Sequence, residues 1–185
     1  MPDTEFDVVV LTAEAHLPEP AADDWYSRQI HHEEGLLIDG LRAHGLRVAR
    51  RAWSDRDFDW SSTRSAILRS TWDYFHRLAQ FQAWLQRARG ATRLINDAAL
   101  IDWNLDKHYL ADLAAAGVEV VPTHYVERGS AETLAAVMAQ RGWSEIVFKP
   151  VVSGAARETH RTDAAGCAGM EARFARCVAA EAMLV

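Results

Sequence analysis

The chain has 185 residues, of which 49% are hydrophobic, and its formal net charge is −6 at pH 7. That length is enough to bury a core in one domain or in two small ones. The negative charge argues against a nucleic-acid partner, because nucleic-acid binding requires clustered Lys and Arg. Small molecules or proteins are the expected partners.

The sequence shows no pattern that suits a membrane or an export signal. No apolar run approaches the ~20 residues that span a bilayer. The first residues, Met-Pro-Asp-Thr-Glu, are acidic and lack the basic region and the apolar core of a signal peptide. We therefore predict a cytoplasmic protein without a membrane partner.

Short apolar runs alternate with helical patterns through the first half of the chain. One predicted helix ends at Gly45 and another at Gly90, because glycine commonly follows the last turn of a helix. Strands are predicted at residues 6–11, 46–49, 66–68 and 94–95, and loops at 12–27 and 53–62. The alternation indicates an α/β domain with a parallel sheet, which we assign to residues 1–98.

A second unit, α+β in character, is predicted for residues 99–185. Its first helix carries an apolar stripe from Leu105 to Ala116, with Asn104 as the N-cap and Gly117 after the last turn. A further helix is expected after the cap residue Ser130, and another over residues 170–178. Strands are predicted at residues 118–121 and 146–149, each ended by a proline, and at 183–185.

Two lysines of this second unit are candidate binding residues. On a helix, Lys107 lies about 200° from Leu105 and so points away from the apolar stripe, toward a cleft. Strand alternation puts Ile146 and Phe148 on one face and Val147 and Lys149 on the other. A lysine that points inward from a strand needs an anion or a carboxylate nearby, because an unpaired buried charge is costly.

Small residues follow Lys149 at Ser153, Gly154, Ala155 and Ala156. Such residues let backbone N–H groups approach an anion closely, as in loops that cradle phosphates, although an ordinary turn has the same composition. The loop matches neither the Walker A pattern nor the glycine fingerprint of dinucleotide-binding folds.

Taken in order, these pieces resemble the opening of an ATP-grasp domain. They are WNLDK at residues 103–107, VVPT at 120–123 and IVFKPVVSGA at 146–155. In that family the two lysines contact the nucleotide phosphates and the purine edge, and the small-residue loop folds over the phosphates. The resemblance therefore implies ATP binding by Lys107, Lys149, Ser153, Gly154 and Ala155.

The first half carries its own resemblance, in ILRSTWDYF at residues 67–75. This segment is similar to one in ATP-grasp ligases related to the cyclo-ligase of D-cycloserine biosynthesis and to glutathione-synthetase-like enzymes, where it faces the substrate. An arginine there binds a carboxylate as a fork, and the aromatic residues offer flat walls. The alternative is a turn whose aromatic residues pack the domain. The implied substrate-binding residues are Arg69, Ser70, Thr71, Trp72, Asp73 and Tyr74.

The resemblance implies an ATP-dependent ligase that joins a carboxylate to an amine or similar nucleophile through an acyl phosphate, with Mg²⁺ and an amino-acid-like substrate. The family's metal ligands lie downstream of the Lys-Pro strand, and no such cluster follows here, so no metal or catalytic residue is assigned. We expect an incomplete ligase that is inactive as this chain alone. The alternative is a non-catalytic α/β protein that binds a ligand or a partner.

Three further features are open or weaker. Residues 31–34, His-His-Glu-Glu, suggest a solvated helix start rather than a metal site, because neighbouring helix positions do not share a face. The basic residues Arg157, His160 and Arg161 suit either phosphate contacts or a solvated strand. An unfinished sheet edge at Val185 would favour self-association into a homo-oligomer.

Overall fold

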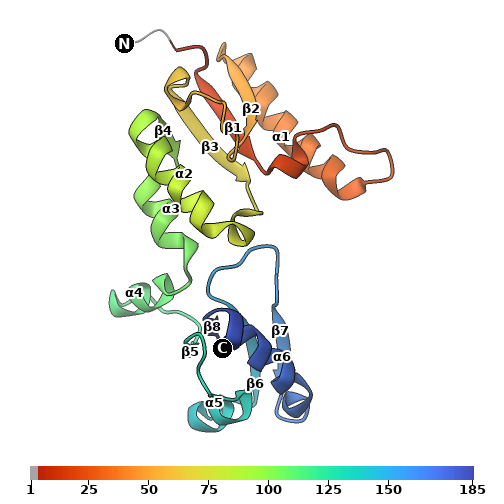
Figure 1. Cartoon of the computed structure of the whole chain (residues 1–185), viewed down its shortest axis with the longest axis vertical. Coiled ribbons are helices and arrows are strands. Elements are labelled where there is room, and N and C mark those ends of the chain that lie inside the picture. Colours follow the sequence, from red (N-terminus) through yellow and green to blue (C-terminus); the bar gives the residue numbers. More distant parts are fainter. Residues whose placement is uncertain (1–3) are drawn as a thin grey trace. The chain divides into compact units, whose positions relative to one another are not determined.

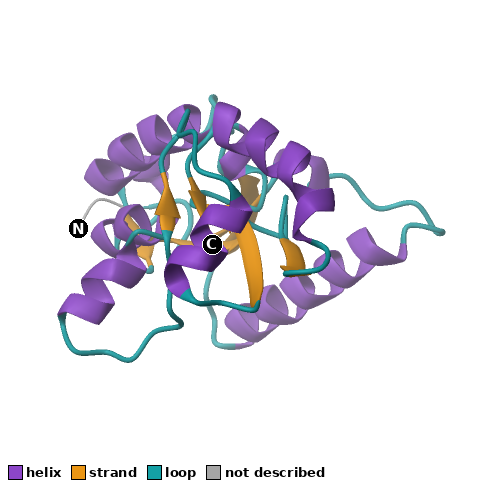
Figure 2. Ribbon diagram, turned by 90° about the horizontal axis from the view of Figure 1, so that it is seen from below, coloured by secondary structure: helices purple, strands orange, loops and turns teal. Residues whose placement is uncertain are grey.

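The computed structural model describes residues 4–185, in which helices and strands alternate (Figures 1 and 2). The chain divides into two compact units, the first ending at Asp102 and the second beginning at Trp103. The predicted boundary between residues 98 and 99 falls at the start of helix α3 (Ala98–Leu105), which spans this division. No helix in the described range is both long and apolar enough to cross a membrane.

The first unit is built on a four-stranded parallel sheet, as the alternation of elements predicted. Its strand order is β2-β1-β3-β4, so the chain moves from β1 to one neighbour and later returns to the other side of β1. Every residue of β1 is buried, as expected for a central strand covered on both faces. The strands are β1 (Val8–Thr12), β2 (Val48–Ala52), β3 (Ser65–Ser70) and β4 (Arg93–Ile95).

Helices lie on both sides of this sheet (Figure 1). Helix α1 (Trp25–Ala43) packs Ile38 against Val8 and Val10, and it ends just before Gly45, which has a φ of 78°. Helix α2 (Leu78–Ala91) continues through Gly90, so the predicted stop at Gly90 is wrong; a glycine inside a helix is tolerated at a modest cost. Short 3-10 turns occupy η1 (Glu14–His16), η2 (Trp60–Ser62) and η3 (Tyr74–His76).

The second unit contains an antiparallel sheet in the order β5-β8-β6-β7. The predicted sheet edge at Val185 is wrong, because β8 lies between β5 and β6. The backbone N–H of Val185 donates to His124 O at 2.8 Å and its carbonyl accepts from His124 N at 2.9 Å. The strands are β5 (Tyr125–Val126), β6 (Glu145–Pro150), β7 (His160–Asp163) and β8 (Met183–Leu184).

Helices α5 (Leu134–Arg141) and α6 (Cys167–Ala180) cover one face of the second sheet and form its core with residues such as Phe148 and Phe174. The N-cap of α5 is Thr133, whose side chain accepts the N–H of Ala136, so the predicted cap at Ser130 is wrong. Glu171 of α6 accepts two further N–H groups of the first turn of α5. This side chain satisfies donors that a helix start otherwise leaves unpaired.

Three predictions for residues 104–121 are wrong. The single predicted helix is two, because α3 ends at Leu105 and α4 (Tyr109–Ala115) begins four residues later. Asn104 therefore lies within α3 and caps nothing, whereas Gly117 does follow α4 with a φ of 84°. Residues 118–121, all within the described range, form no strand, and Val121 is 80% exposed.

Candidate functional site

The face of the second sheet that lies away from the helices carries Lys149. Ile146 and Phe148 of β6 are buried in the core, and Val147 is 41% exposed, which confirms the predicted alternation. Lys149 lies opposite Leu184 of β8, and Leu184 lies opposite Tyr125 of β5. Directly opposed residues share a face, so these three form one row across the sheet. Lys149 is half-buried and points away from the core, not inward.

Lys107 lies in the turn between α3 and α4 rather than on a helix. Asp106 makes this turn by accepting the backbone N–H of His108 at 2.9 Å, a bond that competes with helix continuation. The hydroxyl of Tyr125 donates to Lys107 O at 3.1 Å, and the rings of His108 and Tyr125 stack at 4.3 Å. These contacts fix the turn over the row that ends at Lys149.

The ammonium of Lys107 is bound to the loop that follows β6. It donates to Ser153 O at 2.9 Å, to Ser153 Oγ at 3.0 Å and to Val151 O at 3.2 Å. Burial, and next the positive charge of Lys149, lower the pKa of Lys107 to about 8. The structure thus brings Lys107, Lys149 and Ser153 together, although Lys107 contacts the loop instead of standing free in a cleft.

Lys149 is the unpaired member of this cluster. In the described structure no hydrogen bond or ion pair engages its ammonium, and it is one of only two lysines in the chain. Two neighbouring ammonium groups repel each other, and the one without a partner raises the local positive potential. The arrangement is therefore suited to hold an anion.

The loop of residues 151–159 is shaped by backbone conformations that are uncommon for its side chains. Ala155, Ala156 and Glu158 have φ values of 49°, 57° and 45°, in the left-handed region that glycine adopts more easily. Gly154 O accepts the N–H of Arg157 at 3.0 Å. Such conformations persist only where surrounding contacts hold them.

Side-chain contacts within and beside the loop supply part of that support. Arg157 donates two hydrogen bonds to Glu181, at 2.7 and 2.6 Å, and a third to Val152 O at 2.9 Å. His160 contacts Glu158 at 2.8 Å, and Arg161 contacts Glu145 at 2.7 Å. The basic residues predicted as either phosphate contacts or a solvated strand are thus each matched by a carboxylate.

In the first unit, the carboxyl ends of β1 and β3 meet where the strand order reverses. The register shifts there: Leu11 is opposite Leu68 and Thr12 is opposite Ser70, so Arg69 has no partner on β1. A residue inserted in this way redirects its side chain. The side chain of Arg69 forms an ion pair with Glu33 of α1. In open parallel sheets this reversal point is the usual place for ligands.

The residues predicted to bind substrate divide into an exposed group and a group that is buried or packed within the turn. Trp72 is 40% exposed, and its ring lies 6.3 Å from that of His16 and 6.5 Å from that of Tyr26. Ser70 and Thr71 are buried. Asp73 accepts the indole N–H of Trp53 at 2.7 Å, and the Tyr74 ring lies 5.5 Å from that of Phe81. Arg69 and Trp72 therefore face solvent, whereas the rest build the turn.

The first unit also contains a buried ion pair, between Glu34 and Arg50, that the sequence analysis did not predict. Glu34 is fully buried and accepts a hydrogen bond from Arg50 Nε at 2.6 Å, so a solvated start at residues 31–34 is wrong for Glu34. Two signals were present. Glu34 lies at helical spacing between Ile30 and Ile38, which are both buried. Arg50 lies two residues after Val48 on β2 and so shares the face that α1 covers.

The described residues contain no group of three or more His, Cys, Asp or Glu side chains that is arranged to hold a metal ion. The charged groups at the two sites instead suit organic or phosphate anions. The second-unit cluster offers ammonium groups and a loop backbone. The first-unit edge offers a guanidinium beside an exposed indole.

Known proteins match both parts of the chain. The family model of the D-cycloserine synthetase DcsG N-terminal domain matches residues 8–96. Over 131 residues, 69% of this chain and 44% of the relative, the sequence is 40% identical to the cycloserine biosynthesis protein DcsG of Streptomyces lavendulae. The chain thus spans about half the length of the relatives that it matches.

Solved structures extend the match to nearly the whole chain. The crystal structure of D-cycloserine synthetase DcsG aligns with a TM-score of 0.78 and 31% identity, over 96% of this chain and 57% of that one. A RimK domain ATP-grasp protein from Sphaerobacter thermophilus shares the fold, with a TM-score of 0.64 and 18% identity, over 96% of this chain and 62% of its own. The predicted resemblance to the N-terminal portion of ATP-grasp ligases is confirmed.

Proposed function

We propose that this chain forms part of an ATP-dependent ligase, because residues 8–96 match the family model of the D-cycloserine synthetase DcsG N-terminal domain and the chain resembles the N-terminal portion of ATP-grasp ligases. The ligase joins a substrate carboxylate to an amine or a similar nucleophile. The observation that carries this proposal is the meeting of the chain's only two lysines beside the loop at Ser153.

The residues of the second unit fit a nucleotide phosphate. Lys149 offers an ammonium without a protein partner, and Lys107 holds Ser153 while adding a second positive charge. Positioning and charge neutralisation are what a protein contributes to phosphoryl transfer. ATP, with Mg²⁺, would supply the phosphoryl group that activates the substrate carboxylate as an acyl phosphate. The loop at residues 153–155 would cover the phosphates.

The residues of the first unit fit an amino-acid-like substrate. Arg69 already binds a carboxylate, that of Glu33, through its guanidinium, and a substrate carboxylate would take the place of Glu33. The exposed ring of Trp72, with His16 and Tyr26 beside it, offers a flat wall for the rest of a small molecule. This choice of substrate rests on the position of Arg69 at the strand-order reversal.

The nucleotide part is tested by calorimetric titration with Mg-ATP. Replacing Lys149 by Ala should weaken binding by about tenfold or more, because a charge-assisted contact to phosphate is lost. Arg161→Ala is the matched control, since Arg161 is an exposed cation of the same sheet that is paired with Glu145. Equal losses in the two variants would contradict a phosphate site at Lys149.

The second candidate is a non-catalytic α/β protein that binds a ligand or a partner. It predicts no nucleotide binding by the wild-type chain, so the titration separates the two. Ligation itself is tested as phosphate release from ATP that depends on an added amino-acid-like carboxylate. That assay uses the polypeptide isolated from its natural source, because the 131 residues that align with the curated relative cover 44% of its length.

A further inference from the structure

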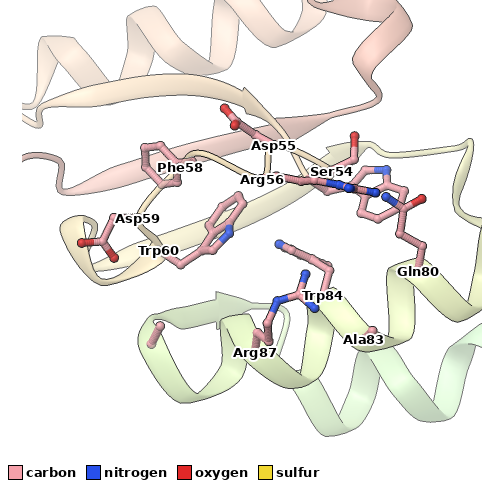
Figure 3. A pocket seen from close by; sticks show the side chains of 12 residues that line it. Ser54, Asp55, Arg56, Phe58, Asp59, Trp60, Gln80, Ala83, Trp84 and Arg87 are labelled. Atoms are coloured by element: carbon pink, nitrogen blue, oxygen red, sulfur yellow. The ribbon is translucent and has the colours of Figure 1, made fainter.

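The first unit contains a pocket that the sites described above do not use. It has a volume of about 580 Å³ and lies between helix α2 and the loop that follows β2 (Figure 3). None of the residues from Arg69 to Tyr74 lines it. Four of its twelve lining residues are aromatic: Trp53, Phe58, Trp60 and Trp84.

Trp84 brings a buried donor without an acceptor into this pocket. Its side chain is 2% exposed, yet no acceptor in the described structure takes its indole N–H. Trp53 differs, because its N–H donates to Asp73 at 2.7 Å. The ring of Trp84 lies 5.6 Å from that of Trp60 at 73°, and an aromatic face is a far weaker acceptor than an oxygen. A buried donor in this state is destabilising until an acceptor arrives.

Cationic groups stand beside that donor. Arg87 follows Trp84 by three residues on α2 and so shares its face of the helix, and Arg56 reaches in from the loop (Figure 3). Within the described structure, neither guanidinium has an ion-pair partner. Asp55 and Asp59 also line the pocket; each accepts a backbone N–H through one carboxylate oxygen, at 3.1 and 2.9 Å, and keeps its negative charge. The indole N–H of Trp84 and the guanidinium groups of Arg56 and Arg87 are the donors that the pocket offers.

We propose that this pocket binds a small planar carboxylate. The guanidinium of Arg87 pairs with the carboxylate as a fork, the indole N–H of Trp84 donates to the same anion, and the flat body of the ligand packs against the ring of Trp60. Arg56 supplies a second positive charge from the opposite wall. The proposal does not depend on nucleotide binding by the second unit.

Benzoate is a suitable probe, because it combines a carboxylate with a planar apolar ring. The chain has seven tryptophans, and a ¹H–¹⁵N spectrum gives each indole N–H its own signal. Trp84→Phe identifies the signal of Trp84. Benzoate at millimolar concentration should shift that signal saturably, and Arg87→Gln should raise the apparent dissociation constant by about fivefold or more. Arg89→Gln, an exposed change two residues further on that lies outside the pocket, should leave the constant unchanged.

Three outcomes overturn the proposal. The first is a Trp84 signal that stays in place at saturating benzoate while the protein remains folded. The second is equal binding of the neutral isostere benzamide, which would make the pocket an apolar slot without preference for an anion. The third is an equal response to inorganic phosphate, which would remove the role of the planar body. Both arginine variants are at the surface, so the comparison does not depend on a change to the core.

Discussion

Lys107 binds Ser153 twice, through the carbonyl oxygen at 2.9 Å and through the hydroxyl at 3.0 Å. The same ammonium lies close enough to Lys149 for their charges to interact. One side chain therefore links the position of the small-residue loop to the positive potential beside it. A phosphate that binds Lys149 also stabilises the charged form of Lys107, and with it the hydrogen bonds that hold the loop.

Nucleotide affinity should fall as the pH rises through about 8. The pKa of Lys107 is lowered from 10.5 to about 8, mainly by burial and then by Lys149. Below that value Lys107 is charged and attracts phosphate, whereas above it the free protein must take up a proton before it binds. Titration with Mg-ATP on both sides of pH 8 checks this. Lys107→Met should bind Mg-ATP more weakly than the wild type below pH 8, and its affinity should not change near pH 8. A wild-type affinity that is the same on both sides of pH 8 would contradict the role of Lys107 in this pH dependence.

Mg-ATP should protect both lysines from acylation. The only amines of the chain are Lys107, Lys149 and the terminal amine, so a short pulse of acetic anhydride gives three acetylated amine sites to follow by peptide mass spectrometry. A bound phosphate keeps an amine protonated and covered, and a protonated amine does not react. The terminal amine serves as the internal reference. If nucleotide slows none of the three sites, or slows all three equally, the lysine cluster is not its binding site.

Local pattern was enough to predict the parallel sheet and the alternation along β6. It also singled out the two lysines that the structure brings together, although not the backbone position of Lys107. The order of strands was not, because pairing is a non-local property: β8 is flanked by β5 and β6, which removes the edge expected at Val185. Leu105 and Tyr109 have the spacing of one helix but belong to two helices. The side chain of Asp106 accepts the backbone N–H of His108 and ends the first helix between them.

The candidate site residues show the same contrast between what local sequence predicts and what non-local strand pairing decides. Period-two alternation put Lys149 on the face opposite Ile146 and Phe148, but the expectation that it points inward was wrong, because its surroundings depend on which strands lie beside it. Glu181 was not singled out, because only the antiparallel pairing of β8 with β6 brings it to Arg157. The bulge at Arg69 likewise follows from the register of β3 on β1, and no local sequence signal marks it.

Glu181→Gln should loosen the loop of residues 151–159. The substitution keeps the shape of the side chain but removes the charge that pairs with Arg157 at 2.6 Å, and the left-handed residues Ala155 and Ala156 then lose a restraint. Limited trypsin digestion should cut after Arg157 sooner than in the wild type. Glu119→Gln, at an exposed acidic residue without a recorded partner in the described structure, is the control. Equal cleavage rates in all three proteins would show that the ion pair does not hold the loop.

Arg50→Met should lower the free energy of unfolding of the first unit by about 3–5 kcal/mol, because it leaves Glu34 buried without its partner. No other donor compensates Glu34 in this variant, since its Oε1 atom is already without a hydrogen bond in the described structure. Chemical denaturation measures the loss, with Arg93→Met, an exposed arginine of the same sheet, as the reference. The double variant Glu34→Leu/Arg50→Met should recover most of the stability, because two apolar side chains remove the buried charge altogether. If the double variant is as unstable as Arg50→Met, the lost free energy of unfolding comes from the packing of Arg50 against its neighbours rather than from the unpaired carboxylate of Glu34.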